Sequence, residues 1–340
     1  MNALVAIFTE LLTSLNQTLR LSASFPALLF VAANVVLVQR YFKFSLFDPF
    51  FGNSSPLGIA VCSALALLTA FTLSSLNGPI VKLLEGHSLR RFRLGRWLME
   101  AHIERLHWLR QEERRLRGRI ARFAGGAEDY MERLDGNPTS RDEFRKYLRA
   151  TVDLGNAVVE MRDYFPTKEH LILPTRLGNA IAAFEDYPNW RYGIDAVALW
   201  PRLVPILKKT GYAQTVERYK TAFDFFLNMA MLSTLFGLEL AYVIAYFEGR
   251  LPVIEVGITV LVMWIFYHFT TAVAINWGET VRVAFDLFRH KLRAVLRLRK
   301  PYEYEREVEL WQRYSAFLRD SEAEPHRGDL VYDKRSEELE

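Results

Sequence analysis

The 340-residue sequence contains a single cysteine, Cys62. One cysteine excludes an intrachain disulfide and a zinc site built on cysteines. The N-terminal stretch MNALVAIFTELLTSLNQTLRLSA has no basic region before its apolar residues and carries an acid at Glu10, which argues against a signal peptide. We expect residues 1–21 to form an amphipathic helix that lies on the membrane or against partner helices.

The motifs of common nucleotide-binding and hydrolytic enzymes are also missing. The phosphate loop GxxxxGK[ST], a GxGxxG turn and the nucleophile elbow GxSxG do not occur. His102 and His107 are five residues apart, which places them on different faces of a helix, unlike the pair in an HExxH zinc site. The sequence therefore predicts no catalytic residue, no metal site and no cofactor.

Long apolar runs are the main feature that is present, in a chain that is 51% hydrophobic. Four of them approach the ~20 residues that a helix needs to cross a bilayer. They are residues 25–41, 57–76, 223–247 and 253–275. Short connectors join the first to the second and the third to the fourth. The predicted fold is all-α, a polytopic membrane protein with four transmembrane helices in two hairpins plus a helical cytoplasmic domain.

Basic residues gather after the second and fourth spans and are scarce in the two short connectors. Those after the second span are Lys82, Arg90, Arg91, Arg93 and Arg96, and those after the fourth include Arg282, Arg289, Lys291, Arg293, Arg297, Arg299 and Lys300. Loops rich in lysine and arginine stay in the cytoplasm. We therefore expect both termini and the long middle segment to be cytoplasmic.

The segments between the spans complete the predicted organisation. It comprises the amphipathic helix at 1–21, a hairpin at 22–78, a cytoplasmic helical domain at 79–222 with an interfacial segment at 173–209, a hairpin at 223–276, cytoplasmic helices at 277–320 and a disordered tail at 321–340. One helix is expected to continue from 79 to about 123. Its arginine-rich face is interpreted first as solvated, next as a surface for anionic lipid head groups at Arg90–Arg122, and last as a nucleic-acid surface, because no base-reading motif accompanies it.

Polar residues inside the spans are candidates for function, because lipid makes them costly unless they face protein or water. They are Asn34, Asn228, Glu239 and His268. Glu239 has two interpretations: part of an ion or proton path, or an interhelical hydrogen bond with Asn34, Ser63 or Thr69. His268 is interpreted as a hydrogen-bonded structural residue.

The block LPTRLGNAIAAFEDYPNWRYGIDAVALWPRL, residues 173–203, combines charge, aromatic rings and prolines. Pro174 and Thr175 are expected to begin a short helix, and Tyr187-Pro188 to end it. The part that follows, with Trp200 and two prolines, is too short and broken to span and suits the membrane–water interface.

The charged residues of this block allow two roles. In the favoured one, Arg176 or Arg191 forms a bidentate pair with Glu185, Asp186 or Asp195 and braces the fold. In the other, the block binds an anion or a lipid head group. The donors would then be Arg176, Arg191 and Arg202, and the walls would be Tyr187, Trp190 and Trp200.

Three motifs resemble a family of uncharacterised bacterial integral membrane proteins. They are LNGPI at the end of the second span, the series RLGN, EDYP, RYGID and WPRL in the middle block, and GETVRVAFDLFR after the last span. The resemblance covers most of the chain. It implies a bacterial membrane location, hence the inner membrane, and carries over no catalytic residue.

These features lead to three functional hypotheses. The first is a homo-oligomeric ion channel or pore-like assembly with a cytoplasmic gating or assembly domain. It is motivated by the two hairpins, by Glu239 and by the small residues of the second span, which favour close helix contact. The second is a membrane-anchored scaffold or signalling effector with a cytoplasmic protein partner. An intramembrane lipid-modifying enzyme is the least favoured, since no acid–base or nucleophile set is recognisable.

Overall fold

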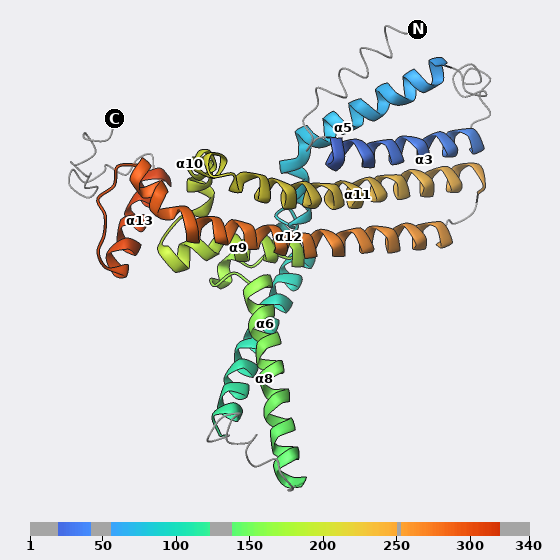
Figure 1. The fold of residues 1–340 in the computed structure, drawn as a ribbon. Coiled ribbons are helices and arrows are strands. Elements are labelled where there is room, and N and C mark those ends of the chain that lie inside the picture. Colours follow the sequence, from blue (N-terminus) through green and yellow to red (C-terminus); the bar gives the residue numbers. More distant parts are fainter. Residues whose placement is uncertain (1–19, 42–55, 123–137, 250–252, 320–340) are drawn as a thin grey trace. The chain divides into compact units, whose positions relative to one another are not determined.

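The computed structural model describes residues 20–41, 56–122, 138–249 and 253–319 (Figure 1). Over these ranges the chain is built from helices and has no β-strand, so the predicted all-α fold is confirmed. Almost all of the predicted N-terminal amphipathic helix (1–21) and the whole predicted tail (321–340) lie outside the described residues.

Four helices are long and apolar enough to cross a membrane within the described part of the chain. They are α3 (Phe25–Tyr41), which follows the short π-helix η1 (Arg20–Ser24), α5 (Pro56–Leu84), α11 (Tyr212–Phe247) and α12 (Val253–Val295). Each contains one predicted span, so the protein is a membrane protein. The α12 helix continues past the fourth predicted span without interruption to Val295, so the first of the helices predicted at 277–320 is the second half of α12.

The chain divides into two compact units. Unit 1 comprises residues 1–83 and 202–292 and contains nearly all of the four spanning helices. Unit 2 comprises residues 84–201 and 293–340 and contains the helices predicted to be cytoplasmic. The two units are described separately below.

In unit 1, α11 packs against both α3 and α12. Phe25 meets Phe225 at one end of the α3–α11 pair, with ring centroids 6.1 Å apart, and the Tyr41 hydroxyl donates to Glu248 at 2.5 Å at the other. The α3 and α11 helices therefore run in the same direction, as expected if both hairpins enter the membrane from one side.

The α11–α12 pair is antiparallel and closely packed. Phe223 lies against Trp277 with ring centroids 5.3 Å apart. Nearer the connector, Gly237 faces Thr259 so closely that a Cβ on this glycine would lie 2.1 Å from the Thr259 methyl carbon. A glycine at this position allows the two backbones to approach, as small residues commonly do between membrane helices.

In unit 2, the helix predicted from 79 to 123 is interrupted, so that prediction was wrong. The α5 helix ends at Leu84, and α6 (Arg93–Ala121) begins only after a turn and a short 3₁₀-helix, η2 (Leu89–Arg91). Gly86 takes a left-handed conformation (φ 85°) that stops α5. The Thr175 hydroxyl lies 2.9 Å from the Leu84 carbonyl oxygen and 2.8 Å from that of Glu85, and thereby caps the end of α5.

The α6 helix pairs with α8 (Pro138–Tyr164). The core between them contains Leu106, Leu109, Ala157, Phe165 and Ile172. At the edge of this core, the Arg105 guanidinium binds both carboxylate oxygens of Glu160, at 3.0 and 2.8 Å. The two helices thus form a hairpin with an apolar seam and a charged border.

The middle block forms two helices, α9 (Arg176–Tyr192) and α10 (Ala196–Lys209). Thr175 caps the start of α9 as predicted, because its hydroxyl accepts a hydrogen bond from the Gly178 amide at 3.0 Å. The predicted end at Pro188 was wrong. The helix tolerates this proline in its last turn and stops at Gly193, whose φ of 75° allows its own amide and the next to bond back to the helix. Two prolines also lie inside α10 without breaking it.

The last helix, α13 (Tyr304–Arg319), packs on the end of α9. The Ser315 hydroxyl accepts from the Asp195 amide at 3.0 Å and donates to the Gly193 carbonyl at 3.3 Å. Trp311 on the same helix is completely buried. Segments far apart in the sequence therefore close unit 2 around α9.

Candidate functional site

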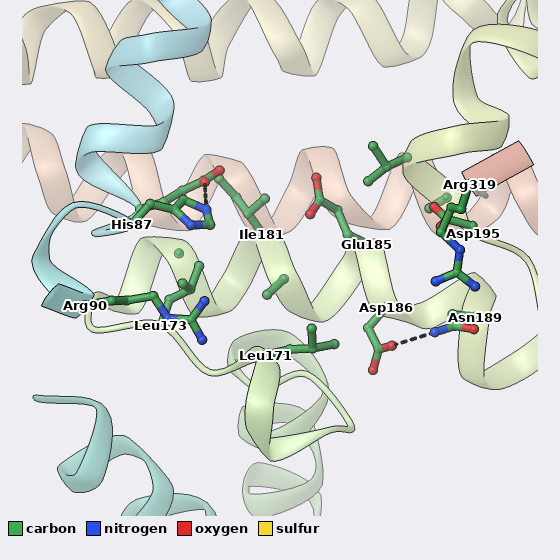
Figure 2. Close-up of a pocket in the computed structure, with 15 residues that line it drawn as sticks. His87, Arg90, Leu171, Leu173, Ile181, Glu185, Asp186, Asn189, Asp195 and Arg319 are labelled. Atoms are coloured by element: carbon green, nitrogen blue, oxygen red, sulfur yellow. Dashed lines mark hydrogen bonds and ion pairs between the residues drawn. The ribbon is translucent and has the colours of Figure 1, made fainter. Parts of the chain in front are cut away.

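A charged cavity of about 280 Å³ lies in unit 2 beside α9 (Figure 2). Its walls come from four parts of the chain: the connector after α5, the segment before α9, α9 with the start of α10, and the end of α13. The charged or titratable lining residues are Glu85, His87, Arg90, Glu185, Asp186, Asp195 and Arg319.

Most of these charged groups hold one another or the backbone. His87 Nε2 lies 2.8 Å from a Glu85 carboxylate oxygen. Arg319 Nε lies 3.3 Å from Asp195 Oδ2. Asp186 accepts a hydrogen bond from the Thr167 amide at 3.0 Å and fixes the segment that precedes α9. The contacts of Asp195 and Asp186 join different segments and thus brace the cavity wall.

Arg90 is held by main-chain oxygens instead of a carboxylate. Its Nη2 donates to the carbonyl oxygens of His170 and Ile172, at 3.0 and 3.5 Å. It therefore ties the 3₁₀-helix η2 to the segment that leads into α9. The Arg90 side chain lies at one end of the cavity (Figure 2).

Glu185 differs from the other carboxylates of the cavity. Its carboxyl makes no hydrogen bond or ion pair with any residue that the structure describes, and Figure 2 shows it pointing into the cavity from the same face of α9 as Ile181. The side chain is open to the cavity, yet surrounding protein displaces enough water to raise its pKa from 4.5 to about 7, and the charges of Glu85 and Asp195 add to this effect.

The raised pKa makes unit 2 sensitive to pH near neutrality. Unfolded, Glu185 ionises near pH 4.5; folded, it ionises near pH 7, so the folded state holds the extra proton between these values. Stability contributed at this site is therefore greatest at low pH and is lost as the pH rises through about 7. Because the carboxyl remains open to solvent, the effect is moderated.

We predict that Glu185→Gln raises the Tm of the full-length protein by about 2–4 °C at pH 8, corresponding to about 1 kcal/mol. At pH 5 the two proteins should melt within a degree of each other, because the wild-type carboxyl is then protonated. Thermal unfolding across this pH range measures the difference. Glu104→Gln, an exposed acid on α6, is the control and should leave the pH dependence unchanged.

Two roles were predicted for Arg176 and Arg191: bracing the fold through ion pairs, or donating hydrogen bonds to a bound ligand. Neither arginine takes either role in the way expected. Arg176 lies over the Tyr164 ring, 4.0 Å from its centroid, and Arg191 is exposed beside Trp190. The predicted bidentate pairs with Glu185, Asp186 or Asp195 are absent from the described residues, so that prediction was wrong. Asp186 and Asp195 find partners on other segments instead.

The predicted ligand donors are also spread out. Arg176 and Arg191 begin and end α9, about 22 Å apart at 1.5 Å per residue. One lipid head group cannot reach both. The predicted walls pack on each other, since Tyr187 meets Trp190 edge to face with centroids 5.8 Å apart. Arg202 and Trp200 lie on α10, where Arg202 is exposed and Trp200 half-buried.

The polar residues of the spans separate into two groups. Asn228 is buried, and its amide donates to the Ser22 carbonyl at 2.9 Å. Asn34 donates to the Phe30 carbonyl of its own helix at 3.1 Å. The amide nitrogens of both residues are thus bonded within one chain, whereas the side-chain oxygen of Asn228 is buried without a hydrogen-bond partner among the described residues.

Glu239 and His268, by contrast, are exposed on the outer faces of α11 and α12. The His268 ring stacks on Trp264 with centroids 5.6 Å apart. Glu239 makes no hydrogen bond or ion pair within the described residues, so its predicted bond to Asn34, Ser63 or Thr69 was wrong there. Its neighbours on the same face, Leu238 and Tyr242, are 65% and 69% exposed.

The cavity was missed by sequence reasoning, because Glu85, His87 and Arg319 meet Glu185 only through the fold. The EDYP motif did single out Glu185 and Asp186. Among the described residues, no group of three or more histidine, cysteine or acidic side chains is arranged to hold a metal ion. Comparisons of the chain with protein-family models, curated proteins and solved structures find no match.

Proposed function

We propose that this protein is a bacterial inner-membrane protein whose chains associate into a channel-like homo-oligomer, with unit 2 and both termini in the cytoplasm. The observation that carries the proposal is the exposed carboxyl of Glu239 within an apolar span, which has no hydrogen bond or ion pair with any residue that the structure describes. A charged side chain near the middle of a bilayer costs about 2.5–3.5 kcal/mol even by the lowest scale, and such residues normally face protein or water.

The burial of the spans supports the same proposal. Only 17–28% of the residues in the most apolar window of each spanning helix are buried within the single chain. The small residues of α5 are divided: Ala66 and Ala70 are buried, whereas Ala60 and Ala64 are exposed and available for close contact with another helix. A second copy would cover such faces, and an assembly of several copies would place the Glu239 carboxyls around a shared polar path.

Planar-bilayer recording with purified protein tests the proposal. We expect the wild type to conduct ions and Glu239→Gln to change the conductance or the cation selectivity several-fold, because the ring of carboxyls would line the path. Glu217→Gln makes the same chemical change at an exposed position of α11, 22 residues earlier, and should conduct like the wild type. Silence of all three proteins, together with a monomeric mass in detergent, would contradict the proposal.

A membrane-anchored scaffold is the second candidate, and one surface favours it. On α8, Leu148, Val152 and Val159 are exposed at helical spacing, on the side away from the core with α6. A protein partner in the cytoplasm would cover this stripe. Copurification from native membranes distinguishes the candidates, since a channel built from one chain returns only itself, whereas a scaffold returns a partner that Val152→Glu releases.

A further inference from the structure

Exposed aromatic and basic side chains alternate where α6 begins. Phe92, Leu94 and Trp97 are 63%, 59% and 61% exposed. Arg93 and Arg96 lie between them, Arg91 directly precedes Phe92, and all three arginines are exposed. We call these six residues the basic–aromatic surface. Leu94 and Trp97 are three residues apart and so share one face of the helix.

The positive charge of this surface is not neutralised by the part of the chain that the structure describes. Arg91, Arg93 and Arg96 have no ion pair there, whereas arginines further along α6 do. Arg105 binds Glu160, and Arg110 Nη1 lies 2.5 Å from a Glu169 oxygen. Three uncompensated charges therefore lie together at the start of the helix.

Two acids mark the end of the basic–aromatic surface. Glu100 and Glu104 follow on α6, and both are exposed. Arg114 and Arg119 are exposed beyond them, but Arg114 is 21 residues after Arg93, about 30 Å along the helix. One aromatic residue further along the described part of α6, Trp108, is 49% exposed, but it lies under the Arg105 guanidinium, whose charge is paired with Glu160. Within that part of the helix, unpaired arginines and exposed aromatic side chains lie side by side in the first turns.

Chain connectivity keeps this surface near the bilayer. The α5 helix has 29 residues and is about 43 Å long, against a hydrocarbon core of about 30 Å and a total bilayer thickness of about 40–45 Å. A helix that begins at one face thus ends among the head groups of the other. Arg93 follows Leu84 by nine residues, which span at most about 30 Å even when fully extended.

We infer that the basic–aromatic surface binds the head-group region of an anionic bilayer. Each arginine near a negatively charged leaflet contributes about 1 kcal/mol. Phenylalanine, leucine and tryptophan side chains on such a surface insert at the boundary between head groups and acyl chains, where tryptophan is enriched in membrane proteins. The lipid is recognised by its negative head group, and the site does not depend on whether the chains form a channel.

The test uses the full-length protein in nanodiscs, with Cys62→Ser removing the native thiol. Trp97→Cys is labelled with an environment-sensitive fluorophore, and Val152→Cys on α8, also 61% exposed in the wild type, is the matched control. In discs containing phosphatidylglycerol, the label at 97 should emit at shorter wavelength and be quenched by lipids that carry a quencher below the head group. In phosphatidylcholine discs the effect should weaken, and the label at 152 should respond to neither lipid.

Charge removal provides the second arm. Replacing Arg91, Arg93 and Arg96 together with glutamine should weaken the binding of this surface to the phosphatidylglycerol bilayer by about 100-fold. This loss is equivalent to about 1 kcal/mol per charge. Replacing Arg114 and Arg119 with glutamine should leave it unchanged. Unaltered emission from the label at 152 and an unaltered Tm establish that the variants are folded.

Two results would overturn the inference. The first is equal emission and quenching at position 97 in the two lipids, unaffected by the triple substitution. The second is a label at 97 whose emission shifts to shorter wavelength with the number of protein copies in each disc and does not depend on lipid charge. That result would assign the surface to contact between copies.

Discussion

Trp311→Ala is expected to lower the free energy of unfolding by about 3–5 kcal/mol, the usual cost of removing a large buried aromatic side chain. Trp311 is completely buried in α13, the helix that closes unit 2 over the end of α9. Deleting the indole leaves a cavity in the core of unit 2. The α13 backbone packs closely on the Gly193 turn, where a Cβ on this glycine would lie 2.6 Å from the Val308 carbonyl oxygen. Thermal unfolding of the full-length protein should show a Tm lower by roughly 10 °C.

Two variants give this expectation its controls. Trp190→Ala removes the same side chain from a site on α9 that is 49% exposed, and should cost less than about 1 kcal/mol. Trp311→Phe retains an aromatic ring and removes an indole nitrogen that is buried without a hydrogen-bond partner within the described residues, so it should be much milder than alanine. Equal losses for Trp311→Ala and Trp190→Ala would show that α13 does not close unit 2.

Gly237→Val is expected to destabilise the α11–α12 hairpin by about 3 kcal/mol, at the upper end of the usual cost of overpacking. A Cβ at this position would lie 2.1 Å from the Thr259 methyl carbon and 3.0 Å from the Thr259 Cβ. Thr259 cannot turn aside freely, because its hydroxyl donates to the Glu255 carbonyl at 2.9 Å. The two helices must separate, and unfolding in detergent should occur at a lower temperature.

The same hairpin contains a matched control, Gly257, where an added Cβ would meet nothing within 4 Å. Gly257→Val should therefore change stability by less than about 1 kcal/mol. A double-mutant cycle with the smaller change Gly237→Ala, which adds only the Cβ, sharpens the test. Thr259→Ala removes the obstructing methyl group and should recover part of the stability that Gly237→Ala loses. Strict additivity of the two substitutions would mean that the helices do not approach each other at this point.

The spans could be predicted because their signal is local. About twenty successive apolar residues identify a membrane helix regardless of the rest of the chain, and the predicted end of the first span at 41 and the start of the last at 253 coincide with the ends of α3 and α12. The N-cap at Thr175 was predictable for the same reason, because the cap bonds to an amide three residues away.

The features that sequence reasoning missed depend on contacts between distant segments. The end of α5 at Leu84 is capped by a hydroxyl 91 residues further on, and nothing in the local pattern of residues 79–123 indicates it. Pro188 suggested a stop, but Gly193 and its contact with α13 decide where α9 ends. The acids of the middle block were assigned to nearby arginines, whereas Asp195 pairs with Arg319. Proximity in sequence was a poor guide to ionic partners.

The position of Thr175 has a mechanical consequence. Its side chain lies against the last carbonyls of α5, and the same oxygen accepts from the first turn of α9. A pull on the end of α5 therefore reaches α9 directly through this residue, without passing along the long stretch of chain that joins them. Thr175→Val keeps the shape of the side chain but removes its hydrogen bonds, so the end of α5 and the α9 wall of the charged cavity would then be joined less tightly, through remaining contacts such as those of Arg90.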